Sequence, residues 1–183
     1  LCIEACPTDA IIAPNVLDSR LCISYLTIEL KGSIPKKLRP QMGNLIFGCD
    51  ICQEVCPWNS KATQTRERGF YPRKKNFAPK LLSLINMTRA EFSKRFKGSP
   101  IKRAKRRGFL RNVAVALGNW GSQAAIPAHK QALNDDEALV RSHAAWALGR
   151  IGGRSAGRIL QARLQVETNS EVITEIKEAI REM

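Results

Sequence analysis

Apolar residues in the last third of the chain recur with the period of a helix pair. The triplet Ala-Leu-Gly at 116–118 returns at 147–149, and the pattern of 125–133 returns at 156–164, so both offsets equal 31 residues. A fixed period in this range is typical of a helical solenoid, in which each helix pair buries its apolar face against the next. We therefore predict a tail of about five short helices.

The repeats also predict the places of several single residues. Gly118 and Gly149 are expected to end the first helix of each pair as left-handed caps. Trp120 and Trp146 lie beside these glycines and are expected in the core. From Val172 to Ile180, apolar residues keep the i, i+4, i+7 spacing of a closing amphipathic helix.

The first two thirds of the chain lack this period. The first 60 residues hold all six cysteines, with five prolines between short apolar stretches, which indicates loops, short helices and small strands around a prosthetic group. Further on, Thr88 with Glu91 three residues later predicts a capped helix over 88–97. The predicted fold is mainly α, in three segments: 1–60, a basic connecting segment at 61–108, and helical repeats at 109–183.

The net charge of +14 comes from the middle of the chain. Lys and Arg outnumber Asp and Glu by 17 to 2 in residues 61–111, against 5 to 6 before them and 8 to 8 after them. Such crowding is favourable when phosphates neutralise it, so nucleic acid is the expected partner, with a solvated helix face as the alternative. Half of the eighteen residues from 94 to 111 are basic and none is acidic: Lys94, Arg95, Lys97, Lys102, Arg103, Lys105, Arg106, Arg107 and Arg111.

Other side chains with possible chemistry have simpler interpretations. Phe96 and Phe109 are interleaved with the basic run and could stack on bases, but isolated aromatics near helix starts more often pack in a core. His129 and His143 have no cysteine or carboxylate in motif spacing, which favours ordinary packing. Glycine-rich phosphate loops and nucleophile elbows are absent from the sequence.

The six cysteines carry the strongest signal. Residues 2–7 and 52–57 both read C-x3-C-P, the closing half of the bacterial ferredoxin run C-x2-C-x2-C-x3-C-P. The second copy is extended upstream by Cys49, and the isolated Cys22 can supply the cysteine that it still lacks. Two such endings favour iron-sulfur clusters over zinc, whose paired ligands typically use C-x2-C without the proline.

The ferredoxin rule assigns the ligands, because the cysteine before the proline ligates the other cluster. One cluster is expected to take Cys22, Cys49 and Cys52, with Cys6 reaching over from the first motif. The other takes Cys2 and Cys56, and its two remaining ligands are expected before Leu1. A chain that starts at Leu1, inside a motif, is thus predicted to lack an amino-terminal part.

Cellular location follows from what the sequence lacks. It contains no run of about 18 apolar residues and no secretory signal, so we expect a cytoplasmic protein without membrane insertion. Disulfides are disfavoured for the same reason.

Three stretches give the chain a resemblance to a known family. They are CISYLTIELKG at 22–32, the run from GCDICQ to PWN at 48–59, and the run from GSPIKR to LRN at 98–112. The chain resembles the epoxyqueuosine reductases, which are cobalamin-dependent iron-sulfur enzymes of queuosine biosynthesis. The resemblance implies a ferredoxin-like two-cluster segment followed by HEAT-like repeats, in an enzyme that reduces epoxyqueuosine to queuosine on tRNA.

The resemblance also implies site residues. Ser24, Cys49 and Asp50 are expected beside the cobalamin, whereas catalytic residues belong to a part absent from this chain, which alone is expected to be inactive. The protein is expected to be a monomer with a separate electron donor. Two alternatives stay open: a ferredoxin-type electron carrier fused to a protein-binding solenoid, and a nucleic-acid-binding module with purely structural clusters. The expected tRNA contacts are Lys31, Lys102, Arg103, Lys105, Arg106 and Arg107.

Overall fold

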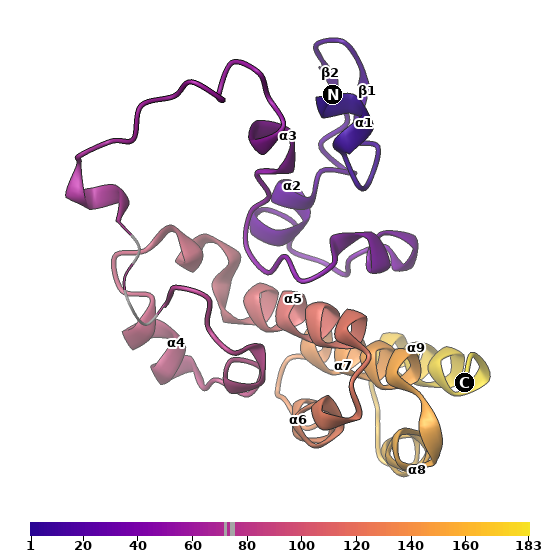
Figure 1. Cartoon of the computed structure of the whole chain (residues 1–183). Helices are drawn as coiled ribbons and strands as arrows, with labels where there is room; N and C mark the ends of the chain where they lie inside the picture. The colour runs from indigo at the N-terminus through magenta and orange to yellow at the C-terminus, as the bar shows by residue number, and fades with distance from the viewer. Residues whose placement is uncertain (72, 74–75) are drawn as a thin grey trace.

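The chain folds mainly into helices in a computed structural model that describes residues 1–71, 73 and 76–183. Three residues of the predicted middle segment, 72, 74 and 75, lie outside this description. Figure 1 shows the cysteine-bearing first segment above a stack of longer helices, with the amino terminus in the former and the carboxyl terminus at the end of the latter. The prediction of a mainly α fold is confirmed.

The first segment consists of short elements joined by loops, as predicted. Asn15, at φ 61°, adopts the left-handed conformation that this residue type tolerates, and thereby turns the chain between two antiparallel strands. The elements are α1 (Cys2–Ala5), β1 (Ile11–Ala13), β2 (Val16–Leu17), α2 (Ile23–Ile28), the 3₁₀ helices Lys36–Leu38 and Pro40–Met42, and α3 (Ile51–Glu54).

Helix α4 (Arg89–Arg95) confirms the predicted capping signal. The Thr88 hydroxyl accepts from the Glu91 backbone N–H at 3.2 Å, and the Glu91 carboxylate accepts from the Thr88 backbone N–H at 2.7 Å. Phe96 packs against Phe109 with ring centroids 5.0 Å apart, and both are nearly fully buried. Core packing is thus confirmed for both rings, and neither is exposed for base stacking. Further 3₁₀ helices are Arg68–Phe70, Leu81–Ser83, Pro100–Ala104 and Gln123–Ala125.

Five α-helices follow, in agreement with the predicted number. They are α5 (Lys105–Trp120), α6 (Ile126–Ala132), α7 (Ala138–Ile151), α8 (Gly153–Leu164) and α9 (Ser170–Arg181). Helix α7 packs between α5 and α9, and these three helices form one layer. Helices α6 and α8 form a second layer (Figure 1). Val172, Ile176 and Ala179 of α9 are buried, as the spacing predicts.

The prediction for Gly118 and Gly149 is wrong. Both lie inside helices. The residues with positive φ that end α5 and α7 are Gly121 at φ 68°, which is left-handed helical, and Gly152 at φ 72°, which is not. Gly149 instead permits close helix packing, because a β-carbon there would lie 2.8 Å from the Ala179 Cβ. The repeated glycine therefore marks a close contact between helices, and the residues that end the helices lie three positions later.

The prediction that both tryptophans are core is wrong for Trp120. It lies at the end of α5 and is 55% exposed, whereas Trp146 in the middle of α7 is 8% exposed. Trp146 belongs to a cluster of buried residues that joins the first segment to the repeats. The cluster comprises Ile23, Leu26, Ile34, Leu38, Met42, Val115, Trp146 and Ala147.

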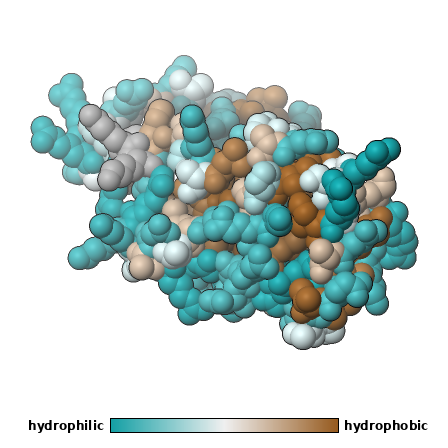
Figure 2. Space-filling model, turned by 90° about the horizontal axis from the view of Figure 1, so that it is seen from below, coloured by the Kyte–Doolittle hydropathy of each residue, from teal (hydrophilic) through white to brown (hydrophobic). Residues whose placement is uncertain are grey.

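Polar side chains cover much of the molecular face seen from below in Figure 2. Apolar side chains surface mainly on the half of this face that holds the repeat helices. Within residues 1–71, 73 and 76–183, no helix has the length and apolar character needed to cross a bilayer.

Candidate iron-sulfur site and basic surface

Four of the six cysteines surround one cavity. Cys6 follows α1, Cys22 precedes α2, Cys49 lies two residues before α3, and Cys52 lies within α3. All four line a cavity of about 340 Å³. Apolar side chains make up most of the rest of its wall, including Ala10, Ile11, Val16, Leu17, Ile23 and Ile51.

The thiols of this cavity influence one another electrostatically. Burial raises the pKa of Cys49, and the neighbouring Cys22, Cys52 and Cys6 raise it further because like charges repel. Burial alone would raise the pKa of Cys6 as well, but hydrogen bonds lower it overall. One of them comes from the Ala10 backbone N–H, which donates to Cys6 Sγ at 3.2 Å. A cationic cluster would relieve the repulsion by binding thiolates.

The four cysteines around the cavity match the ligand set of one cluster in number. Each iron of a 4Fe-4S cluster binds its own thiolate, so four thiolates around one space are what such a cube requires. All six cysteines are free of disulfides.

Cys2 and Cys56 lie outside this cavity. Cys2 is the first residue of α1 and is exposed, and Cys56 follows α3 and is half-buried. Helices α1 and α3 contact each other, so the structure brings these two cysteines into the same neighbourhood although 54 positions separate them.

Of the three residues expected beside a cobalamin, Cys49 lines the cavity, whereas Ser24 and Asp50 flank it. Ser24 lies in the first turn of α2 and is half-buried, and Asp50 immediately precedes α3 and is exposed. Their expected role stays a prediction.

The basic residues divide into exposed and buried sets. Lys102, Arg103 and Lys105 are exposed, and the Lys31 ammonium donates to the Arg103 carbonyl at 3.4 Å, which places Lys31 beside them. The Arg103 guanidinium also pairs with Glu29. Arg107 is half-buried.

Arg106 and Arg111 are held by the protein itself. The guanidinium of Arg106 forms two hydrogen bonds to the Asp135 carboxylate and donates to the Met87 carbonyl at 2.7 Å. Arg111 is fully buried. Dense charge in the sequence therefore does not translate directly into a basic surface.

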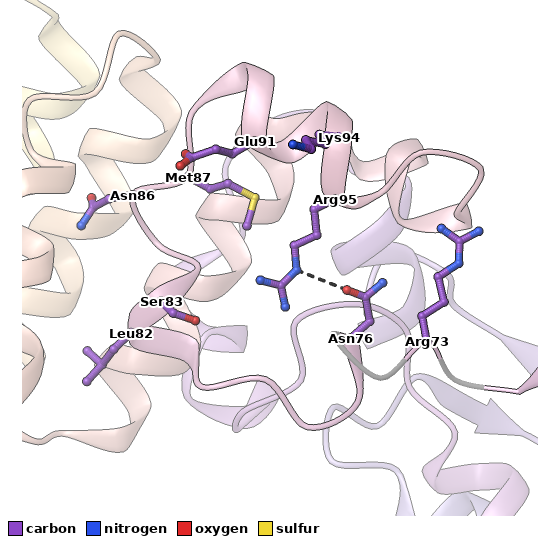
Figure 3. A pocket seen from close by; sticks show the side chains of 9 residues that line it. All are labelled: Arg73, Asn76, Leu82, Ser83, Asn86, Met87, Glu91, Lys94 and Arg95. Atoms are coloured by element: carbon purple, nitrogen blue, oxygen red, sulfur yellow. Dashed lines mark hydrogen bonds between the residues drawn. The ribbon is translucent and has the colours of Figure 1, made fainter.

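A second cavity adds a basic residue that sequence reasoning did not single out. It has a volume of about 670 Å³ and lies between α4 and the segment before it (Figure 3). Lys94 and Arg95 line it together with Arg73, which donates to the Lys97 carbonyl at 2.7 Å. Arg95 donates to the Asn76 side chain at 3.2 Å. No motif in the sequence marks Arg73 as their neighbour.

The fold and the cysteine site define the chain as an iron-sulfur protein with helical repeats. Residues 1–59 match the family of 4Fe-4S double cluster binding domains, and residues 103–181 match HEAT repeats. More particularly, the chain is homologous to the carboxy-terminal portion of the epoxyqueuosine reductases.

Relatives from several bacteria support this assignment. The chain is 49% identical over 152 residues to epoxyqueuosine reductase of Xanthomonas campestris and 44% identical over 163 residues to that of Escherichia coli. These matches cover 82% and 89% of the chain but 43% of each relative, so the chain spans less than half of their length.

Solved structures agree with the sequence matches. The Bacillus subtilis epoxyqueuosine reductase superimposes with a TM-score of 0.93 at 31% identity, over 100% of this chain and 49% of that one. An epoxyqueuosine reductase solved with an epoxyqueuosine-modified tRNA-Tyr stem loop also gives a TM-score of 0.93 at 31% identity, over 99% of this chain and 48% of that one.

Proposed function

We propose that this chain is the electron-relay and tRNA-binding portion of an epoxyqueuosine reductase. The whole enzyme would reduce the epoxide of epoxyqueuosine in tRNA to the alkene of queuosine. The observation that carries the proposal is the cavity lined by four cysteines, within the same molecule as an exposed basic surface. Its homology to enzymes of this name supports the same conclusion.

For the redox part, we assign one 4Fe-4S cluster to Cys6, Cys22, Cys49 and Cys52, and the other to Cys2 and Cys56 with ligands from outside this chain. Such clusters supply one-electron transfer. The chain's own contribution is to hold the thiolates, to surround them with a largely apolar wall, and to donate the Ala10 N–H to a ligand sulfur. Cobalamin would lie beside the first cluster, near Ser24, Cys49 and Asp50.

For the RNA part, we assign phosphate contacts to the exposed basic surface formed by Lys31, Lys102, Arg103 and Lys105, with Arg107 at its half-buried edge. Support comes from the proximity of Lys31 to Arg103, which joins residues 72 positions apart. A relative was solved with a tRNA stem loop, which makes tRNA the nucleic acid of choice.

The proposal is tested with the full-length gene product, loaded anaerobically with clusters and cobalamin and given a low-potential reductant. Epoxyqueuosine-containing tRNA should be converted to queuosine-containing tRNA, and tRNA affinity should fall as salt rises. No conversion by protein with loaded clusters would refute the proposal. Absence of any salt-dependent tRNA affinity would favour the electron carrier with a protein-binding solenoid.

A further inference from the structure

Helix α5 carries a polar pair in the interior of the protein. Arg111 and Asn112 are both fully buried, and Arg111 Nε donates to Asn112 Oδ1 at 3.0 Å. Burial lowers the pKa of Arg111 to about 10, so the guanidinium still carries its charge at neutral pH. Buried polar groups cost free energy unless they are hydrogen-bonded, so their partners indicate what the pair is for.

The partners of Arg111 lie in the cysteine-bearing segment. Its Nη2 donates to the Leu26 carbonyl at 2.6 Å, and its Nη1 donates to the carbonyls of Leu30 at 2.9 Å and Gly32 at 2.6 Å. The last carbonyls of a helix lack intrahelical partners, and a cation is favourable there. Arg111 thus holds the carboxyl end of the six-residue helix α2, whose amino end directly follows Cys22.

Asn112 extends the same hydrogen bonding to the loop before Cys49. Its Nδ2 donates to the Thr27 carbonyl at 2.8 Å and to the Ile46 carbonyl at 2.9 Å. The buried Thr27 hydroxyl accepts from the Gly48 backbone N–H at 2.9 Å. Asn112 therefore links residue 46 to α2, the Thr27 hydroxyl binds residue 48 to α2 directly, and Cys49 is the next residue.

From these contacts we infer that Asn112 and Thr27 are positioning residues of the cluster cavity, which set Cys49 relative to Cys22. Arg111 and Asn112 hold α2 from one side, while Thr27 and Asn112 hold the loop that carries Cys49. Helix α5, the first repeat helix, thereby fixes the positions of Cys22 and Cys49 relative to each other. The inference rests on the proposed cluster at these cysteines, and it gives the HEAT-like repeats a role in cluster binding in addition to contacts with RNA.

The chain offers matched variants. Thr27→Val removes the hydroxyl that holds Gly48 and keeps the side-chain shape, whereas Thr27→Ser keeps the hydroxyl. Asn112→Ala is matched by Asn119→Ala, because Asn119 on the same helix also donates to two carbonyls of the first segment, Arg39 at 2.8 Å and Gly43 at 2.9 Å. Along the chain, these two carbonyls are farther from the nearest cysteine than the Thr27 and Ile46 carbonyls that Asn112 binds.

The measurements are made on full-length protein reconstituted anaerobically: iron release to a chelator, the midpoint potential, and the electron paramagnetic resonance spectrum of the reduced cluster. Outer-shell substitutions typically cost 10–100-fold in metal affinity, so Thr27→Val and Asn112→Ala should release iron about tenfold faster and shift the spectrum. Thr27→Ser and Asn119→Ala should stay within about twofold of the unmodified protein.

Two results would overturn the inference: a Thr27→Val protein that matches Thr27→Ser in all three measurements, or equal effects of Asn112→Ala and Asn119→Ala. If Asn112→Ala does not fold, the threonine pair alone decides. Failure of the unmodified protein to take up iron would be a different outcome, since it would refute the proposed cluster itself.

Discussion

Arg39 and Glu175 form a buried ion pair between the first segment and the last repeat helix. The Nη1–Oε1 distance is 2.9 Å, and the two side chains are 1% and 8% exposed. The Arg39 guanidinium also lies 5.4 Å from the centroid of the Trp146 ring, and Ser142 donates to the Glu175 carboxylate at 3.4 Å. Residues 136 positions apart are thereby fixed to each other across the cluster of buried residues that joins the two parts.

We predict that Glu175→Gln destabilises the protein by about 3 kcal/mol, because it leaves the buried Arg39 charge without its counterion. The free energy of unfolding from urea titration measures the effect. Arg89→Ala breaks an ion pair with Glu137 in which Arg89 is 71% exposed, and it should cost less than about 1 kcal/mol. Equal losses in the two variants would contradict the assignment of Arg39–Glu175 as a structural pair.

His129 should make the protein sensitive to acid. Burial lowers its pKa to about 4, and neither ring nitrogen has a hydrogen-bond partner among the described residues. Because the unfolded state binds a proton near pH 6.5 and the folded state does not, stability is lost as pH falls below about 6.5 towards 4. From pH 7.5 to pH 5 this single residue should lower the free energy of unfolding by about 2 kcal/mol.

Urea titrations of His129→Leu at those two pH values check this. The variant should lose about 2 kcal/mol less than the unmodified protein between them. Part of the acid sensitivity should persist, since burial also lowers the pKa of His143 well below its usual value. An unchanged pH dependence in His129→Leu would rule out the protonation of His129 as a cause.

Substitutions in the basic run should fall into two classes, those that weaken tRNA binding and those that destabilise the fold. Lys102→Ala with Lys105→Ala should weaken tRNA binding and reduce the slope of log affinity against log salt by about 2, with stability unchanged. Arg106→Ala should instead destabilise the fold, because Asp135 is 8% exposed and loses its guanidinium partner. Filter binding across salt concentrations and thermal unfolding distinguish the classes, and a reduced salt slope only in Arg106→Ala would reverse them.

Adding a single methyl group at Gly149, where α7 contacts α9, should destabilise the protein. Gly149→Ala would place its β-carbon 2.8 Å from the Ala179 Cβ and 3.0 Å from its Cα, so α9 must move, at a cost of about 1–3 kcal/mol. Gly157→Ala in α8 meets only the flexible Met183 side chain at 3.5 Å and should be neutral or stabilising by up to about 1 kcal/mol. Thermal unfolding that ranks Gly149→Ala at least as stable as Gly157→Ala would contradict the packing.

Local signals in the sequence were sufficient for much of the fold. The capping box of Thr88 and Glu91 and the apolar stripe of α9 depend on neighbours within a turn or a helix. The 31-residue repeat is a periodicity of the sequence itself, so the sequence alone predicts all three features. The predictions for Gly118 and Trp120 are wrong because the environment of each residue depends on how the neighbouring helix packs. Helix packing is a tertiary feature that the local sequence does not reveal.

The site shows the same division. Cysteine spacing singled out the four residues that line the cavity, because a short ligand motif is a local feature. Charge alone could not separate Lys102, which is exposed, from Arg111, which is buried against carbonyls some 80 positions away in the chain. No motif in the sequence marks Thr27, since the contact of its hydroxyl with Gly48 joins residues 21 positions apart.

The most direct test of the central claim is the iron and sulfide content of single cysteine variants after anaerobic reconstitution. Cys22→Ser should lose the cluster of the apolar cavity and its reduced-state paramagnetic signal, about four iron atoms per chain. Cys56→Ser, outside the cavity, should keep that cluster. A Cys22→Ser protein that retains its full iron content and signal, while Cys56→Ser loses both, would contradict the assignment of Cys6, Cys22, Cys49 and Cys52 to one cluster.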